Sequence, residues 1–285
     1  MNPNDSHNDD EPKGGLLGRR EALMLFGGAS AAVLLGGGMV RLVSAQSGSS
    51  SATATATPAA TGTAVPACVV RPALTEGPYF IESELNRSDI RIEPSDESIK
   101  DGALLKLLFR VFDVSGGMCT PFEGAMVDVW HCDAEGVYSG VSDPGFDTSD
   151  LRFLRGYQIT DENGEAAFTT IYPGWYSSRT VHIHFKIRTD PDSDEGTEFT
   201  SQLFFDDLFT DEVYKQAPYS ARGQRDTLNR QDNIYAGSEG LLTLDVQEDE
   251  DGYTAEFGIG LDLESAGIVA SGPGASGAAG WPANA

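Results

Sequence analysis

His182 and His184 are the residues of this chain whose types and spacing most directly predict chemistry. They lie in residues 180–188, Thr-Val-His-Ile-His-Phe-Lys-Ile-Arg, where apolar residues recur at every second position as in a β-strand. The apolar side chains fall on one face, which we expect to be the core face, and both imidazoles project from the other. The strand alone leaves two interpretations open: a metal site, or a solvated histidine pair beside Lys186 and Arg188.

Two tyrosines lie upstream on segments that read as turns. Tyr138 ends Gly-Val-Tyr, and Tyr176 ends Tyr-Pro-Gly-Trp-Tyr at residues 172–176, shortly before the histidine strand. Together with the two imidazoles, these phenols can form a metal site of mixed nitrogen and phenolate-oxygen ligands.

The elements that must position these residues are short strands. Alternating or apolar patterns predict strands over residues 105–111, 125–132, 156–160, 166–171, 180–188, 199–205, 241–246 and 253–261. Turn-forming residues separate them, and one short helix is predicted at 211–216 with Thr210 as N-cap. The sequence therefore predicts an all-β domain, an antiparallel β-sandwich with long decorated loops and at most one or two short helices.

The N-terminus reads as an export signal. Arg19 and Arg20 precede an uncharged, glycine-containing stretch, and Val43-Ser44-Ala45 supplies the small residues that a signal peptidase needs. We expect a twin-arginine signal over 1–45, although the uncharged stretch is also long enough for an uncleaved membrane anchor. The protein is then exported, to a periplasmic, extracellular or cell-surface location.

Composition divides the rest of the chain. Residues 46–67 are rich in Ser, Thr, Ala and Pro and predict a linker, residues 68–265 form the predicted catalytic domain, and 266–285 predict a flexible tail. The formal net charge of −25 argues against nucleic acid and anionic membranes as partners. Of the three cysteines, we expect Cys68 and Cys119 to pair and Cys132 to be a buried free thiol.

Seven motifs, taken in order, resemble the intradiol ring-cleavage dioxygenases, which are non-haem Fe(III) enzymes of the protocatechuate and catechol dioxygenase type. The resemblance covers nearly all of residues 68–262. The motifs are TEGPYF at 75–80, VDVWHCD at 127–133, GVYS at 136–139, LRGYQ at 154–158, TIYPGWY at 170–176, RTVHIHF at 179–185 and QLFF at 202–205.

The resemblance implies one Fe(3+) per chain with four protein ligands. Tyr138 and His184 would be equatorial, and Tyr176 and His182 axial. Ferric iron is a hard cation that suits phenolate oxygen. Because a free tyrosine has a pKa near ~10, only a strong local cation makes phenolate the resting form at neutral pH.

The resemblance also implies the reaction. A catechol-type aromatic ring would be cleaved with O₂ between its two hydroxyl-bearing carbons, giving a cis,cis-muconate-type diacid. Tyr176 would take up a substrate proton, Arg179 would stabilise negative charge on the substrate, and Gln202 would lie near iron-bound solvent. A surface salt bridge for Arg179 and an ordinary strand glutamine at position 202 are the alternatives.

Other positions carry weaker expectations. Tyr79 resembles a residue that lines the substrate pocket, with a structural turn as the alternative, and Trp175 is a second candidate for the pocket wall. We expect Tyr172 in the core and His131 as a hydrogen-bonded structural histidine. Asp128 and Asp133 are candidates for supporting or turn roles.

Departures from the family pattern leave the substrate and assembly open. Catechol and hydroxyquinol members carry a long helical dimerisation segment before the sandwich, whereas here the linker precedes Cys68. The chain therefore looks closer to the protocatechuate type or to exported single-chain relatives. A homo-oligomer is compatible with the sequence, and the need for a second subunit stays open.

Two rival functions remain to be tested. One is a non-catalytic extracellular transthyretin-like binding module, which would not need both tyrosines and both histidines. The other is a zinc hydrolase that uses the histidine pair, although no third histidine or suitably spaced Glu follows the strand.

Overall fold

The computed structural model describes residues 68–143, 145–191 and 196–263 of the 285-residue chain. The predicted export signal, the linker and the whole of the predicted tail lie outside these residues. All described residues belong to one compact unit. Within them, no helix has the length and apolar character needed to cross a membrane.

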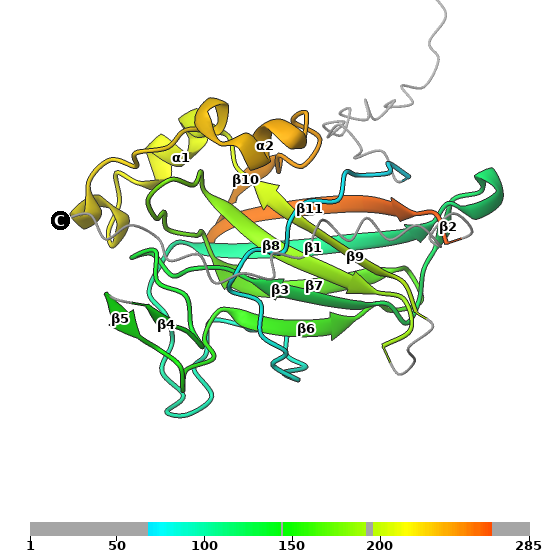
Figure 1. The fold of residues 1–285 in the computed structure, drawn as a ribbon, viewed down its shortest axis with the longest axis horizontal. Coiled ribbons are helices and arrows are strands. Elements are labelled where there is room, and N and C mark those ends of the chain that lie inside the picture. The colour runs from blue at the N-terminus through cyan, green and yellow to red at the C-terminus, as the bar shows by residue number, and fades with distance from the viewer. Residues whose placement is uncertain (1–67, 144, 192–195, 264–285) are drawn as a thin grey trace, which may run out of the picture. The chain divides into compact units, whose positions relative to one another are not determined.

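Strands in two sheets dominate the fold (Figure 1). The first sheet contains β1 (Leu104–Asp113), β2 (Thr120–Pro121), β7 (Glu165–Ile171), β10 (Val246–Asp249) and β11 (Gly252–Leu261). The second has the order β6-β3-β8-β9 and comprises β3 (Met126–Trp130), β6 (Arg155–Ile159), β8 (His182–Arg188) and β9 (Glu198–Phe204). A small hairpin pairs β4 (Ser142–Asp143) with β5 (Phe146–Asp147).

Helical segments are short, as predicted. They are α1 (Asp207–Val213), α2 (Asn233–Gly237) and the 3₁₀ turns η1 (Ser115–Gly117), η2 (Tyr219–Arg222) and η3 (Asn229–Gln231). Both α-helices follow β9 in the chain and lie above the strands in the view of Figure 1. The all-β class is confirmed.

The core lies between the inner faces of the two sheets. The ring of Phe109 on β1 is 5.3 Å from that of Phe185 on β8, which is the contact expected when two sheets pack face to face. Val181, Ile183, Phe185 and Ile187 are all 2 % exposed or less, so the predicted core face of the histidine strand is confirmed.

Three details of the fold differ from the sequence predictions. The sandwich is not purely antiparallel, because β1 and β11 pair in parallel. The helix begins four residues earlier than predicted: the Asp206 carboxylate, rather than Thr210, accepts from a first-turn amide, that of Phe209. The strand predicted at 241–246 is wrong. Leu242 and Leu244 are buried as the alternation implied, but this segment makes only an isolated bridge to β9 before β10 begins.

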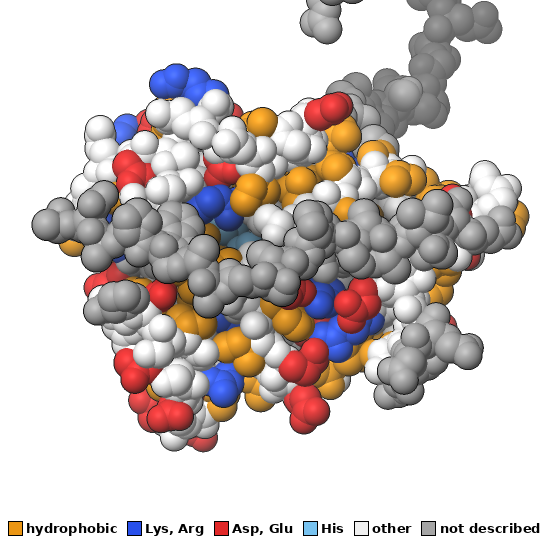
Figure 2. Space-filling view, in the orientation of Figure 1, with side chains coloured by type: hydrophobic (Ala, Val, Ile, Leu, Met, Phe, Trp, Pro, Cys, Tyr) orange, Lys and Arg blue, Asp and Glu red, His pale blue; other side chains and the backbone are white. Residues whose placement is uncertain are grey.

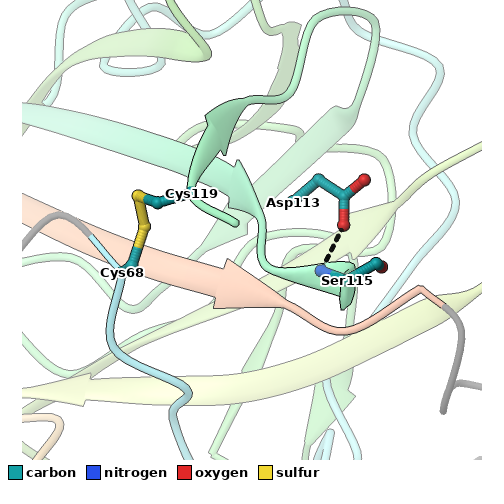
Figure 3. The surroundings of a disulfide bond; sticks show 4 residues. All are labelled: Cys68, Asp113, Ser115 and Cys119. Atoms are coloured by element: carbon teal, nitrogen blue, oxygen red, sulfur yellow. Dashed lines mark hydrogen bonds between the residues drawn. A yellow bond between two sulfur atoms is a disulfide. The ribbon is translucent and has the colours of Figure 1, made fainter. Parts of the chain in front are cut away.

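A disulfide joins Cys68 to Cys119, and Cys132 is a buried free thiol, as predicted (Figure 3). The bond anchors the start of a segment that we call the strap, residues 68–82. Further along, the amide of Leu74 donates to the carbonyl of Thr200 on β9. The strap therefore begins beside β11 of the first sheet, where Val70 bridges Gly260, and then passes onto the outer face of the second sheet, where Gly77 lies against His184.

Candidate metal centre

Strand register places four of the site's side chains in one row across the second sheet. Arg155 pairs with Trp130, Trp130 with His184, and His184 with Gln202. Directly opposed residues in neighbouring strands project from the same face. The Trp130 and His184 rings stack, with centroids 5.0 Å apart and an angle of 9° between their planes.

Two loops bring the tyrosines to this row. Tyr138 follows β3, and Tyr176 lies in the turn before β8. The loops touch at Gly136, which has a φ of 77° and where a Cβ would stand 2.1 Å from the carbonyl oxygen of Trp175. Only glycine fits there, and its close approach leaves the Tyr138 and Tyr176 rings 5.7 Å apart.

Four atoms that can each donate an electron pair to a metal ion converge on one point; we call these four atoms the donors. The Nε2 atom of His182 lies 3.1 Å from Nε2 of His184, 3.2 Å from the Tyr176 hydroxyl and 3.4 Å from the Tyr138 hydroxyl. All four residues predicted as metal ligands are therefore gathered, from two loops and one strand.

A backbone hydrogen bond selects the tautomer of His182. Its Nδ1 atom lies 2.6 Å from the carbonyl oxygen of Thr180, and because a carbonyl only accepts, Nδ1 carries the proton. The lone pair of Nε2 therefore faces the other three donors. Metal-binding histidines are commonly held by a bond of this kind.

The strap buries the histidine face. Gly77 covers His184, the Tyr79 ring stacks on Tyr138 at 4.5 Å, and Phe80 packs against Trp130. His182 and His184 are only 2 % and 1 % exposed, which excludes the solvated histidine pair. Figure 2 shows a small area of histidine on the surface, beside lysine or arginine side chains.

Burial keeps these groups neutral in the absence of a cation. It lowers the pKa of His182 to about 3, with the nearby Arg179 guanidinium as a further cause, and lowers the pKa of His184 well below its usual value. It likewise raises the pKa of the Tyr138 and Tyr176 phenols. A bound cation reverses this preference for the phenols, because it stabilises phenolate.

The four donors fit a single metal ion. Ligands about 2.0–2.2 Å from one ion, and roughly at right angles, lie roughly 3 Å apart, which is close to the separations found here. The described residues contain no group of three or more His, Cys, Asp or Glu side chains placed to hold a metal. The donor set here is instead two imidazoles and two phenols, which suits a hard ferric ion.

Arg179 lies beside the donors, and its guanidinium is hydrogen-bonded through both Nε and one Nη. Its Nε donates to the Asp232 carboxylate at 2.8 Å and one Nη to the Gln202 side-chain oxygen at 2.6 Å. The other Nη lies 3.5 Å from Nε2 of His182. The Gln202 amide nitrogen donates to the carbonyl of Thr75 in the strap. Both ends of the glutamine are thus bonded within the protein, and it contacts Arg179.

The remaining predicted residues divide between the site and its support. The Tyr79 hydroxyl donates to Asp143 at 3.1 Å, while its ring lines the tyrosine cluster. Trp175 is half-buried, with Arg222 stacked on its ring at 4.7 Å. Tyr172 is fully buried in the main core, as predicted.

His131, Asp133 and Asp128 lie outside the donor cluster. His131 is buried and hydrogen-bonded through both ring nitrogens, to the Cys132 carbonyl and the Thr170 hydroxyl, which confirms the structural interpretation. Asp133 accepts from two amides of its own turn, and Asp128 pairs with Arg188.

A separate cleft of about 390 Å³ lies away from the donors. It is lined by Glu93, Asp96, Ser98, Ile99, Lys100, Asp101, Asp133, Ala134, Glu135, Leu151, Phe153 and Pro218. None of the four converging donors contributes to its wall.

Comparisons with known proteins agree with this geometry. Residues 75–234, more than half of the chain, match the family model described as "Dioxygenase". The solved structure of an intradiol ring-cleavage dioxygenase from Tetranychus urticae is 30 % identical, with a TM-score of 0.60 over 68 % of this chain and 95 % of that one. The chain belongs to the intradiol ring-cleavage dioxygenase family.

Curated relatives in this dioxygenase family match over shorter lengths. A chlorocatechol 1,2-dioxygenase of Pseudomonas sp. (strain P51) is 28 % identical over 48 % of this chain and 55 % of its own length. Another, from Pseudomonas putida, is 30 % identical over 29 % of this chain and 36 % of its own length. The matches thus span about a third to a half of these relatives.

Sequence reasoning missed two residues that support this dioxygenase-family site. Asp232 bonds Arg179 from 53 positions away. The buried guanidinium of Arg155 donates to the carbonyls of Tyr79 and Ser139 and lies 5.9 Å from the Tyr138 ring. The LRGYQ motif at 154–158 contained Arg155, but only the fold shows that it ties the strap to the tyrosine loop.

Proposed function

We propose that this protein is a non-haem Fe(III) dioxygenase that opens a catechol-type ring between its two hydroxyl-bearing carbons. Both atoms of O₂ enter the product, a cis,cis-muconate-type diacid. The observation that carries the proposal is the convergence of one imidazole nitrogen and two phenol oxygens within 3.1–3.4 Å of Nε2 of His182, next to a guanidinium. Membership of the family supports it.

The iron would be held by Tyr138, Tyr176, His182 and His184. Bound there, ferric iron would draw charge from a deprotonated diol and make its ring reactive toward O₂. It also makes phenolate the stable form of tyrosines that burial otherwise keeps protonated.

The two tyrosines are placed for different tasks. Tyr138 is 1 % exposed and packed under Tyr79, so it stays in place. Tyr176 is half-buried and precedes the exposed Ser177 and Ser178. Its phenolate oxygen is therefore the one placed to accept a proton from an incoming diol.

Arg179 supplies the positive charge on the substrate side. One Nη lies 3.5 Å from Nε2 of His182, while the rest of the guanidinium donates hydrogen bonds to Asp232 and Gln202. A charge fixed in advance stabilises negative charge on the reacting ring without reorganising. The strap, through Gly77 and Tyr79, keeps water from the opposite side.

Oxygen uptake tests this function. We expect the iron-loaded full chain to consume O₂ with at least one of catechol, a chlorocatechol, hydroxyquinol or protocatechuate, and to place both atoms of ¹⁸O₂ in a ring-opened diacid. Tyr176→Phe should lose this activity, while Tyr172→Phe, whose hydroxyl bonds Thr210 in the core, should keep it. No uptake with any of these substrates would favour the rival binding module.

Export is a second proposal, carried by the Arg19-Arg20 segment and supported by the disulfide, since disulfides persist in oxidising compartments. Replacing both arginines by lysine should retain the folded, iron-containing protein in the cytoplasm. Unchanged export of that variant would refute a twin-arginine route.

A further inference from the structure

Asp232, the N-cap residue of α2, is a buried carboxylate outside the set of four candidate metal ligands. Its side chain is 1 % exposed and accepts four hydrogen bonds. One oxygen accepts from Arg179 Nε at 2.8 Å and from the Thr180 amide at 2.9 Å. The other accepts from the amides of Ile234 and Tyr235, which caps α2.

These bonds hold two parts of the metal centre at once. Through Arg179, Asp232 determines which guanidinium nitrogen faces Nε2 of His182. Through the Thr180 amide, it holds the residue whose carbonyl accepts from Nδ1 of His182. Asp232 therefore holds the N-terminus of α2, the Arg179 side chain and the segment that leads into β8.

The contacts of Asp232 require a carboxylate. The oxygen that faces Arg179 accepts hydrogen bonds from two N–H groups. If the amide nitrogen of an asparagine took its place, a third N–H group would face these two and none of them would have an acceptor. The arginine side chain is only 16 % exposed, so solvent screens the ion pair little.

We infer that Asp232 is a positioning residue for ring cleavage, which acts by orienting the Arg179 guanidinium toward the substrate. The inference rests on the proposed function. It adds the N-cap residue of α2 to a centre otherwise built from the strap, the two tyrosine loops and the second sheet.

The test is a double-mutant cycle in the iron-loaded full chain. Asp232→Asn should lower kcat by roughly 10- to 100-fold, the range expected for losing a charge-assisted hydrogen bond, and leave KM within about threefold. In an Arg179→Gln background, the same change should lower kcat less than about twofold further, because the group through which Asp232 acts is gone. Anaerobic titration of Asp232→Asn with catechol, followed by visible absorption, should show that the variant binds catechol with an affinity within about threefold of wild type.

Asp206→Asn is the matched control. Asp206 caps α1 as Asp232 caps α2, without contacting Arg179. Its kcat should equal that of wild type, and both variants should keep the iron content of wild type. Should Asp232→Asn not fold, Asp232→Ser retains a capping side chain and serves in the same cycle.

The outcomes separate this inference from the proposed function. If wild type is active and Asp232→Asn retains its kcat within about twofold, the positioning role is overturned and the function stands. Equal losses in the wild-type and Arg179→Gln backgrounds also overturn it, because Asp232 would then act independently of Arg179. A wild-type protein without oxygen uptake overturns both.

Discussion

At Gly77 the backbone itself forms a wall of the candidate metal centre. The residue has a φ of 76°, and a Cβ there would lie 3.2 Å from Cε1 of His184. Gly116 has a similar φ of 65°, but a Cβ at that position would meet no atom within 4 Å. Comparing alanine substitutions at the two glycines therefore separates the cost of backbone strain from the cost of a steric contact with His184.

We predict that Gly77→Ala and Gly116→Ala each lose about 1–2 kcal/mol of unfolding free energy from the left-handed backbone. Only Gly77→Ala should also lose iron, roughly tenfold faster than wild type during dialysis against a chelator, because its methyl group displaces His184. Equal iron retention in the two variants would contradict this account of the strap.

Individual residues also show what a single sequence can predict about a site. Tyr138, Tyr176, His182 and His184 were predicted from motif resemblance, and the structure gathers them. Asp232 could not be predicted, because its contact with Arg179 depends on where a loop after β9 returns in space. Its one local signal was that of an N-cap, which is common to many aspartates.

Asp128 on β3 is a buried carboxylate surrounded by charged side chains from other elements. It faces Arg188 and Lys186 of β8, Glu82 of the strap and Glu198 of β9. Burial raises its pKa to about 6, because the loss of solvation outweighs the attraction of Arg188. An unfolded aspartate has a pKa near ~3.9, so between these values the folded protein binds the extra proton.

This difference predicts the sign of a pH effect. Since the folded state binds more protons, stability falls as pH rises from about 4 to about 6. The unfolding free energy of wild type, relative to Asp128→Asn, should be constant below about pH 4, decrease by ~2–3 kcal/mol up to about pH 6, and level off above it. Urea unfolding of both iron-loaded proteins measures this, and parallel pH curves would contradict it.

At the scale of elements, the alternation of apolar residues predicted strands and their core faces, but it did not predict how the strands pair. The period of two in residues 180–188 predicted both the strand and its core face. It could not show that the histidine face is buried too, because the cover is the strap, a segment without a regular pattern. The same period is compatible with either strand direction, which is why the parallel pairing of β1 with β11 was not predicted.

Element ends were harder to predict because several residues offer the same local signal. Asp206 and Thr210 are both good N-caps, and the structure uses the first. Residues 241–246 have a strand pattern with buried Leu242 and Leu244, but the segment finds only a single bridge to β9.

For the whole molecule, the comparisons establish the family. The match at residues 75–234 includes all four candidate ligands, Arg179, Gln202 and Asp232. The chain's curated matches span about a third to a half of the relatives' own length, so their substrates and assemblies are not transferred.

The visible absorption of the iron-loaded full chain tests the central claim most directly. Iron(III) bound by phenolate is coloured through ligand-to-metal charge transfer, so the purified protein should be red-brown. The Tyr138→Phe/Tyr176→Phe variant should lose this absorption, and Tyr172→Phe should keep it. A colourless wild-type protein after iron loading, or a band that persists in the double variant, would contradict an iron centre built on these two tyrosines.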